Sequence, residues 1–133
     1  MLTGMGYTTG SLATGGIVKG QFHVQLIECV GNASSQNVTA VLAVTNTGPN
    51  TLVYIGGNSD GSLAVDSYGS TIKPYNSAGK QYDLPSGTVV RVEIDRIEPV
   101  SPGTPMFQIL RISFGSGHNN TIDFRNVPIV WAN

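Results

Sequence analysis

The chain has 133 residues, of which 11% are charged, and its seven basic and eight acidic side chains leave a formal net charge of −1. A chain of this length forms one domain around a single core, and so few cations exclude a surface that holds nucleic acid or anionic lipid by charge. No run approaches the roughly 18 apolar residues of a membrane-spanning helix.

Glycine dominates the first 20 residues. Six of these residues are Gly, and Lys19 is the one charged residue among them. Because ordering Gly costs backbone entropy, we predict that residues 1–20 form an arm. Apolar side chains such as Leu2 and Tyr7 punctuate the glycines, which favours an arm that lies on a neighbouring subunit over a solvated one. The start carries no secretory leader, so if Met1 is the initiator we expect folding in a cytosol.

From Gln21 onward apolar and polar residues alternate with the period of two that is typical of β-strands. The pattern predicts strands at 21–30, 38–45, 51–55, 62–66, 70–75, 90–94, 106–114 and 121–124, before an apolar run that ends at Trp131. Turn residues separate them, for example at 46–50, 67–69 and 78–80. We therefore predict an all-β fold for residues 21–133, an antiparallel β-sandwich of about 7–9 short strands.

Residues that commonly carry chemistry are scarce. Cys29 is the one cysteine, so no disulfide forms within the chain, and we expect a buried, unreactive thiol. His23 is expected at the surface or rim, and His118 lies in a Gly-rich loop without a partner at a metal-ligand spacing. No nucleophile elbow or phosphate-binding loop occurs. We predict no catalytic, cofactor-binding or metal-binding residues, no cofactor, and a protein that is not an enzyme.

One loop offers the oxygen ligands that calcium prefers. It comprises Asn58–Gly61, with Asp66 nearby in sequence. It lacks the alternating acids and distal Glu of a calcium-binding loop, so a plain hairpin loop is the favoured interpretation. Whether Asp60 and Asp66 bind calcium stays open at this point.

Two further groups leave alternatives open. Glu93 and Asp95 share one strand face, but Arg91 and Arg96 beside them favour a solvated charge ladder over an acid-base pair. Four tyrosines could stack on sugar rings, although rim packing with the hydroxyls in water is the favoured interpretation. They are Tyr54, Tyr68, Tyr75 and Tyr82.

Five stretches of the chain form a recognisable set: VQLIEC (24–29), VTNTG (44–48), DSYG (66–69), YDLPSG (82–87) and IDFRNVPI (122–129). Together they resemble the immunoglobulin-like accessory domains found on bacterial surface proteins and lipoproteins, which implies an antiparallel immunoglobulin-like β-sandwich. The resemblance covers about residues 21 to 130. Because these are turn and core positions, the resemblance implies a fold and no active residues. A sandwich of this size with an N-terminal arm is also similar in architecture to the decoration, or cement, proteins of viral heads.

The low charge guides the functional expectation. Dispersed charges suppress association at strand edges, and this chain has few of them, so we expect partners to cover much of its surface. The leading hypothesis is a structural, self-assembling homo-oligomer that decorates a virion capsid, assembled in the host cytoplasm, with copies of itself or a major capsid protein as partners. We expect no nucleic-acid or membrane partner. The alternatives are a carbohydrate or surface-polymer binding module, and an extracellular filament subunit whose arm is a donated strand.

Overall fold

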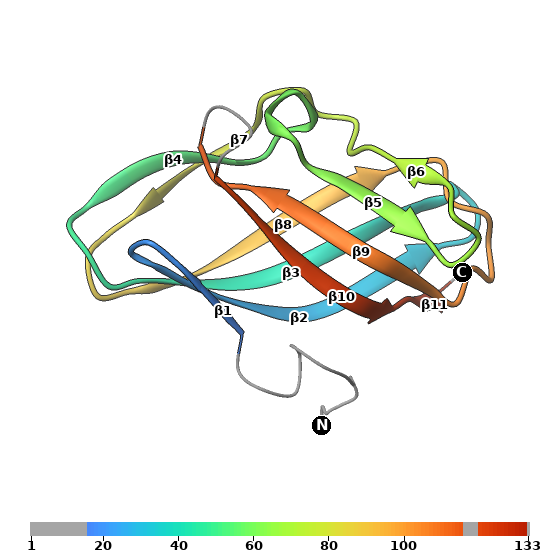
Figure 1. Cartoon of the computed structure of the whole chain (residues 1–133), viewed down its shortest axis with the longest axis horizontal. Helices are drawn as coiled ribbons and strands as arrows, with labels where there is room; N and C mark the ends of the chain where they lie inside the picture. The colour runs from blue at the N-terminus through green and yellow to red at the C-terminus, as the bar shows by residue number, and fades with distance from the viewer. Residues whose placement is uncertain (1–15, 116–119, 133) are drawn as a thin grey trace.

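The computed structural model describes residues 16–115 and 120–132, and these residues are almost entirely β-structure (Figure 1). The elements are β1 (Ile17–Lys19), β2 (Phe22–Asn32), β3 (Asn37–Asn46), β4 (Thr51–Gly56), a short 3-10 helix η1 (Asn58–Asp60), β5 (Leu63–Asp66), β6 (Thr71–Ile72), β7 (Gly79–Leu84), β8 (Val89–Ile97), β9 (Met106–Ser113), β10 (Thr121–Pro128) and β11 (Val130–Ala132). The predicted all-β class is confirmed.

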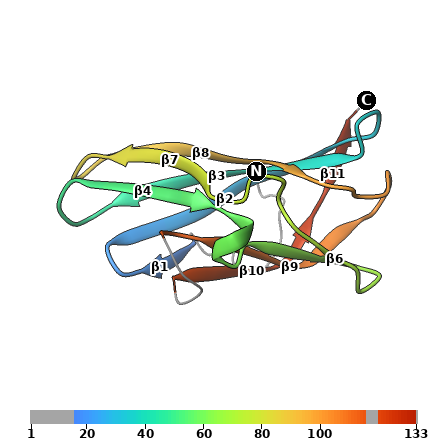
Figure 2. The ribbon, with the colours of Figure 1, turned by 90° about the horizontal axis from the view of Figure 1, so that it is seen from above.

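Two sheets form the layers of a sandwich, as Figure 2 shows from above. The first has the order β1-β2-β3-β8, with β11 added beside β2, and the second has the order β10-β9-β5-β6. A two-stranded ribbon of β4 and β7 extends at one end, on the left of Figure 1. Among the described strands the pairs are antiparallel, as predicted, with one parallel addition, β11 beside β2.

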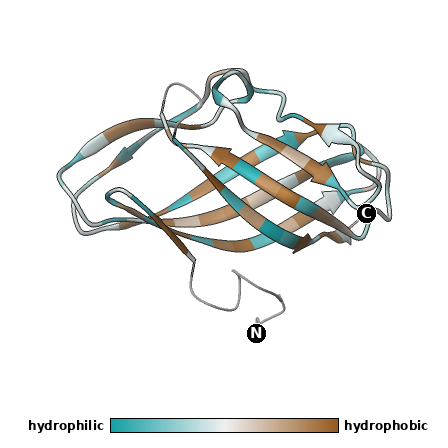
Figure 3. Ribbon diagram, in the orientation of Figure 1, coloured by the Kyte–Doolittle hydropathy of each residue, from teal (hydrophilic) through white to brown (hydrophobic). Residues whose placement is uncertain are grey.

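The core lies between the sheets because alternate residues of each strand point inward. In β2, Val24 and Leu26 are buried while Gln25 is exposed. A register shift between Leu26 and Glu28 then changes the phase, so Cys29 also faces the core, as expected from the sequence. Figure 3 shows the same alternation, with brown and teal residues following one another along β9 and β10. The largest fully buried side chains include Phe107 and Phe124, one from each of these strands.

Some predicted boundaries differ from the structure. Residues 78–80 were expected to form a turn, but Gly79 and Lys80 begin β7 and pair with Gly56 and Ile55. Gly79 has a φ of 80°, which explains why the sequence there reads as a turn. The strand expected at 70–75 shortens to Thr71–Ile72.

The described part of the expected arm is a strand. Residues Ile17–Lys19 pair with Phe22–Val24 as one side of a hairpin, so the sheet begins before residue 20. Residues 1–15 of the predicted arm and His118 lie outside the described residues.

A tight contact closes one end of the sandwich. Trp131 packs against Gly31, where a Cβ atom would lie 2.4 Å from the indole ring. The indole N–H donates a hydrogen bond to the carbonyl of Thr104 at 2.7 Å. Gly31 is therefore required by the ring that covers it.

The buried side-chain amide of Asn46 holds together the connections near the end of β3. The Asn46 side chain is fully buried, and its Nδ2 donates to the carbonyls of Leu84 (2.7 Å) and Pro49 (2.9 Å). Its Oδ1 accepts hydrogen bonds from Gln21 Nε2 and from the Gly48 backbone. This network anchors the ribbon strand β7 to the end of β3.

Candidate functional site

β8 and β10 are the long edge strands of the two sheets, with nine and eight residues. Within residues 16–115 and 120–132, each has a strand partner on one side only, β3 for β8 and β9 for β10. An edge strand presents unpaired N–H and C=O groups that can pair with another chain. The two edges differ in how far the rest of the molecule covers them.

The β8 edge is covered over its second half. The Thr88 carbonyl accepts the Asn46 N–H, so alternation turns the backbone groups of Val89, Arg91 and Glu93 away from β3. At Glu93 these groups meet Tyr82, whose hydroxyl accepts the N–H at 3.2 Å and donates to the carbonyl at 3.4 Å.

The loop that follows β6 covers the end of the same edge. The Tyr75 N–H donates to the carbonyl of Arg96 at 2.9 Å, and Pro74 forms a bridge with Ile97. Thus, as far as the described residues show, the backbone groups of β8 that stay free are those of its first residues.

The β10 edge is left open by residues 16–115 and 120–132. The Phe114 N–H donates to the carbonyl of Asn120 at 2.7 Å, which places the even-numbered residues of β10 toward β9. The backbone groups of Thr121, Asp123 and Arg125 therefore point away from the sheet. In the described part of the chain no strand lies against them.

Among the described residues, the shortest ion pair lies on the outer face of β10 and joins Asp123 to Arg111. Asp123 accepts two hydrogen bonds from Arg111, at 2.7 Å from Nε and 3.0 Å from Nη2. This hydrogen bonding, more than the attraction of Arg111 and Arg125 through space, holds the pKa of Asp123 below its ordinary value. The same pair raises the pKa of Arg111. Arg125 is exposed and, among the described residues, forms no ion pair within 4.0 Å.

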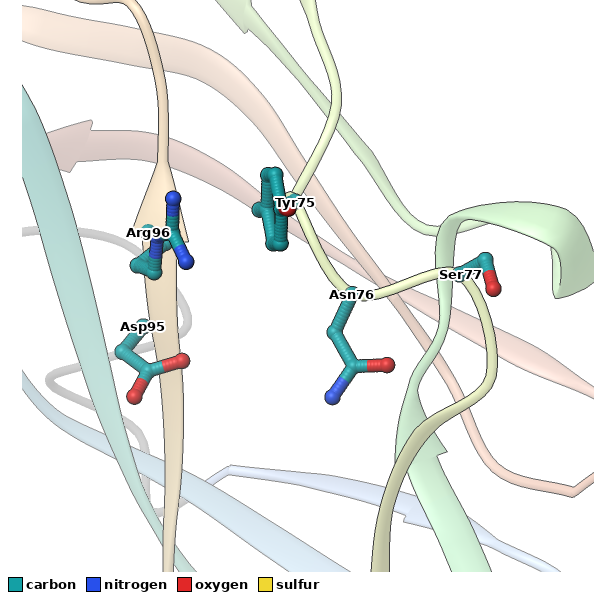
Figure 4. Close-up of a pocket in the computed structure, with 5 residues that line it drawn as sticks. All are labelled: Tyr75, Asn76, Ser77, Asp95 and Arg96. Atoms are coloured by element: carbon teal, nitrogen blue, oxygen red, sulfur yellow. The ribbon is translucent and has the colours of Figure 1, made fainter.

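An open hollow of about 660 Å³ lies between β8 and the loop after β6, and Figure 4 shows the residues that line it. We call it the Tyr75–Arg96 hollow, because the guanidinium of Arg96 lies 3.7 Å from the centre of the Tyr75 ring. Asp95, Asn76 and Ser77 complete it.

The charges in the hollow are already paired. The ammonium of Lys80 lies 3.1 Å from Asp95, which raises the pKa of the lysine, and Arg96 lies 3.3 Å from Glu98. Arg96 also has a φ of 54°, a left-handed conformation that non-glycine residues seldom adopt. The hollow therefore offers polar atoms without a net attraction for an anion or a cation.

The structure separates the two aspartates considered for calcium. Asp60 lies in η1, before β5, whereas Asp66 ends β5. The Oδ1 of Asp66 accepts the N–H groups of Tyr68 and Ser70 and so holds the following turn. No group of three or more His, Cys, Asp or Glu able to hold a metal occurs among the residues described.

The remaining sequence candidates are also dispersed. Glu93 pairs with Arg91 at 3.2 Å, which agrees with a charge ladder, while the partner of Asp95 is Lys80 from β7, a residue the sequence did not single out. Among the tyrosines, Tyr54 and Tyr82 lie on opposite faces of the ribbon, because Tyr82 pairs with Val53. Tyr68 lies in the turn after β5, so the four do not make one platform.

Burial raises the pKa of the Cys29 thiol, with a further contribution from Glu28. No helix within the described ranges is long and apolar enough to cross a membrane. The Arg111–Asp123 pair and the Tyr82–Glu93 contact were not foreseen, and no local spacing could reveal them, since 12 and 11 residues separate the partners.

A scan against protein-family models and a search of curated proteins both find no match for the chain.

Proposed function

We propose that this chain is a non-enzymatic structural subunit that assembles with copies of itself. The observation that carries the proposal is the open β10 edge, an eight-residue strand whose outward backbone groups meet no other described strand. Stable monomers protect such edges, as Tyr82 protects β8, because an uncovered edge strand can pair with a strand of another molecule. The scarcity of charge, 11% of residues, supports the proposal, since charge is what opposes such contacts.

Exposed apolar side chains add to this argument. Val18, Val89 and Val130 are each more than 60% exposed, and all three belong to strands of the five-stranded sheet. Single exposed valines are common on monomers. They lie on β1, β8 and β11 and not in the sheet that contains β10, so they are a separate contribution: each would gain free energy if a second molecule covered it.

The setting we propose is a capsid surface, where the subunit would cover a junction between other subunits. The support is the similarity in architecture to viral decoration proteins. The test is cosedimentation of the purified chain with capsids of the virus whose genome encodes it. A chain that stays in the supernatant beside such capsids would contradict the capsid setting but not the proposed self-association.

Self-association is tested by sedimentation velocity of the full chain across the micromolar range. We expect the mass to rise above the 14.0 kDa of one chain as concentration increases. A mass that stays at that of one chain at every concentration would contradict the proposed function.

A second candidate function, saccharide binding, is favoured by one observation, the Tyr75–Arg96 hollow. The hollow has an aromatic ring, and its charged groups are paired with opposite charges. These features suit a neutral sugar better than an ion. A glycan array probed with the wild-type chain and with Tyr75→Ala tests it. Binding that the substitution abolishes supports this candidate, and an array without signal opposes it.

A further inference from the structure

We propose that two copies of the chain join through their β10 strands, which pair antiparallel so that Asp123 of each copy lies opposite Arg125 of the other. This inference rests on the proposed self-association and names the surface and the register that carry it. The occupant of the open edge is thus a second copy of this chain, and the four-stranded sheets of the two copies become one continuous sheet.

The backbone makes this pairing possible. In an antiparallel ladder, residues that exchange hydrogen bonds must both turn their N–H and C=O groups toward the partner strand. Asp123 and Arg125 both turn these groups outward, because the backbone groups of Phe124 between them face β9. Asp123 and Arg125 of the second copy can therefore exchange both backbone bonds. A two-fold axis beside Phe124 then repeats the exchange, as an isologous contact requires.

Charge selects this register over its neighbours. A shift of two residues in one direction places Asp123 opposite Asp123 of the second copy. The shift in the other direction places Arg125 opposite Arg125. Like charges directly opposite destabilise a pair of strands, whereas opposite charges stabilise it. In the proposed register Asp123 lies between Arg111 of its own chain and Arg125 of the second copy, and charge alternates across the joined sheet.

The edges of β1, β6 and β8 fit a second copy less well. β1 has three residues and β6 has two, which gives either one few backbone groups to share. β8 is covered by Tyr82 and by the loop after β6. In β10 itself, Asn126 adopts a left-handed φ of 55° and Pro128 ends the strand, so the regular ladder centres on residues 123 to 125.

Two substitutions of Arg125 test the proposal by sedimentation velocity. Arg125→Glu places like charges opposite each other twice by symmetry, and we expect dimerisation to weaken by about tenfold. Arg125→Pro removes an outward N–H that the β9 ladder does not use, and we expect dimers to be lost over the same concentration range. Arg91→Glu is the matched control, because it makes the same charge change at an exposed residue of β8, and it should leave dimerisation unchanged.

Hydrogen exchange supplies a readout that does not depend on the variants folding. In the wild-type chain, the amides of Asp123 and Arg125 should become protected as concentration rises, in step with the mass. Protection that is equally strong in the monomer would mean that the chain's own residues cover the edge, and would overturn the proposal. Self-association that Arg125→Glu and Arg125→Pro leave intact would also overturn it, while the proposed function stands. A strict monomer with unprotected amides overturns both.

Discussion

The hydroxyl of Tyr82 takes the place of a neighbouring strand at Glu93. It accepts the Glu93 N–H at 3.2 Å and donates to the Glu93 carbonyl at 3.4 Å, so one side chain satisfies both groups that β8 turns outward at this position. This contact explains why one long edge of the sandwich is protected while the β10 edge is not.

Removing that hydroxyl should leave the β8 edge open at Glu93. We expect Tyr82→Phe to lower the free energy of unfolding by about 0.5–1.5 kcal/mol, the net contribution of an ordinary hydrogen bond, as measured by urea denaturation. Hydrogen exchange at the Glu93 amide should also accelerate. Tyr54→Phe on the same ribbon is the control, since its hydroxyl makes no hydrogen bond to the described residues. Equal losses in the two variants would contradict the assigned role.

Gly31 should not tolerate a side chain while Trp131 is present. A Cβ at Gly31 would lie 2.4 Å from the indole ring, so the ring must move. We expect Gly31→Ala to cost about 1–3 kcal/mol of unfolding free energy, as overpacking does, and to change the fluorescence of the one tryptophan. In a Trp131→Ala background the same substitution should cost much less. A penalty that is the same in both backgrounds would show that the ring is not its cause.

Exchanging the buried amide of Asn46 for a carboxylate should destabilise the fold. In Asn46→Asp, an acceptor oxygen would face the carbonyls of Leu84 and Pro49, which now accept hydrogen bonds from Nδ2. We expect a loss of about 1–3 kcal/mol or more at neutral pH, the cost of unsatisfied buried polar groups. The folded state should raise the pKa of the new carboxyl, so the loss should shrink as pH falls and protonation restores a donor.

Asn50→Asp is the matched control for that substitution. Asn50 uses its Oδ1 only as an acceptor, for the Ser86 N–H, and a carboxylate can accept the same bond. Its stability should therefore match that of the wild-type chain at neutral pH. If both variants lose the same free energy, general charge effects and not the Asn46 network are responsible.

The Arg111–Asp123 pair should give a measurable dependence on pH. The pKa of Asp123 is lowered in the folded chain, so the pair adds stability above the pKa of an unfolded aspartate, and that stability is lost as pH falls through the lowered value. A titration of the Asp123 carboxyl followed by ¹³C NMR should show the lowered pKa. Arg111→Gln should raise it toward the ordinary value. An unchanged titration in the variant would remove Arg111 as the cause.

Much of the strand pattern was accessible from the sequence. Val24 and Leu26 alternate with polar neighbours because one face of a sheet is buried. Alternation alone would put Cys29 on the outer face; its burial was expected because no neighbour in the sequence activates the thiol, and the register shift between Leu26 and Glu28 is what turns it inward. The start of β7 was missed because Gly79, with its positive φ, resembles a turn residue although it pairs with Gly56. The parallel pairing of β11 was missed because it joins residues far apart in the chain.

By itself, the sequence of this protein determined the all-β class and the residues that face inward, because a half-buried sheet imposes a period of two on its strands. Tertiary structure alone decided which edges are open. Whether β8 is covered depends on contacts such as that of Tyr82 with Glu93, which form only after distant strands have paired. Local patterning carries no record of those neighbours, since a strand in the middle of a sheet and a strand at its edge can alternate in the same way.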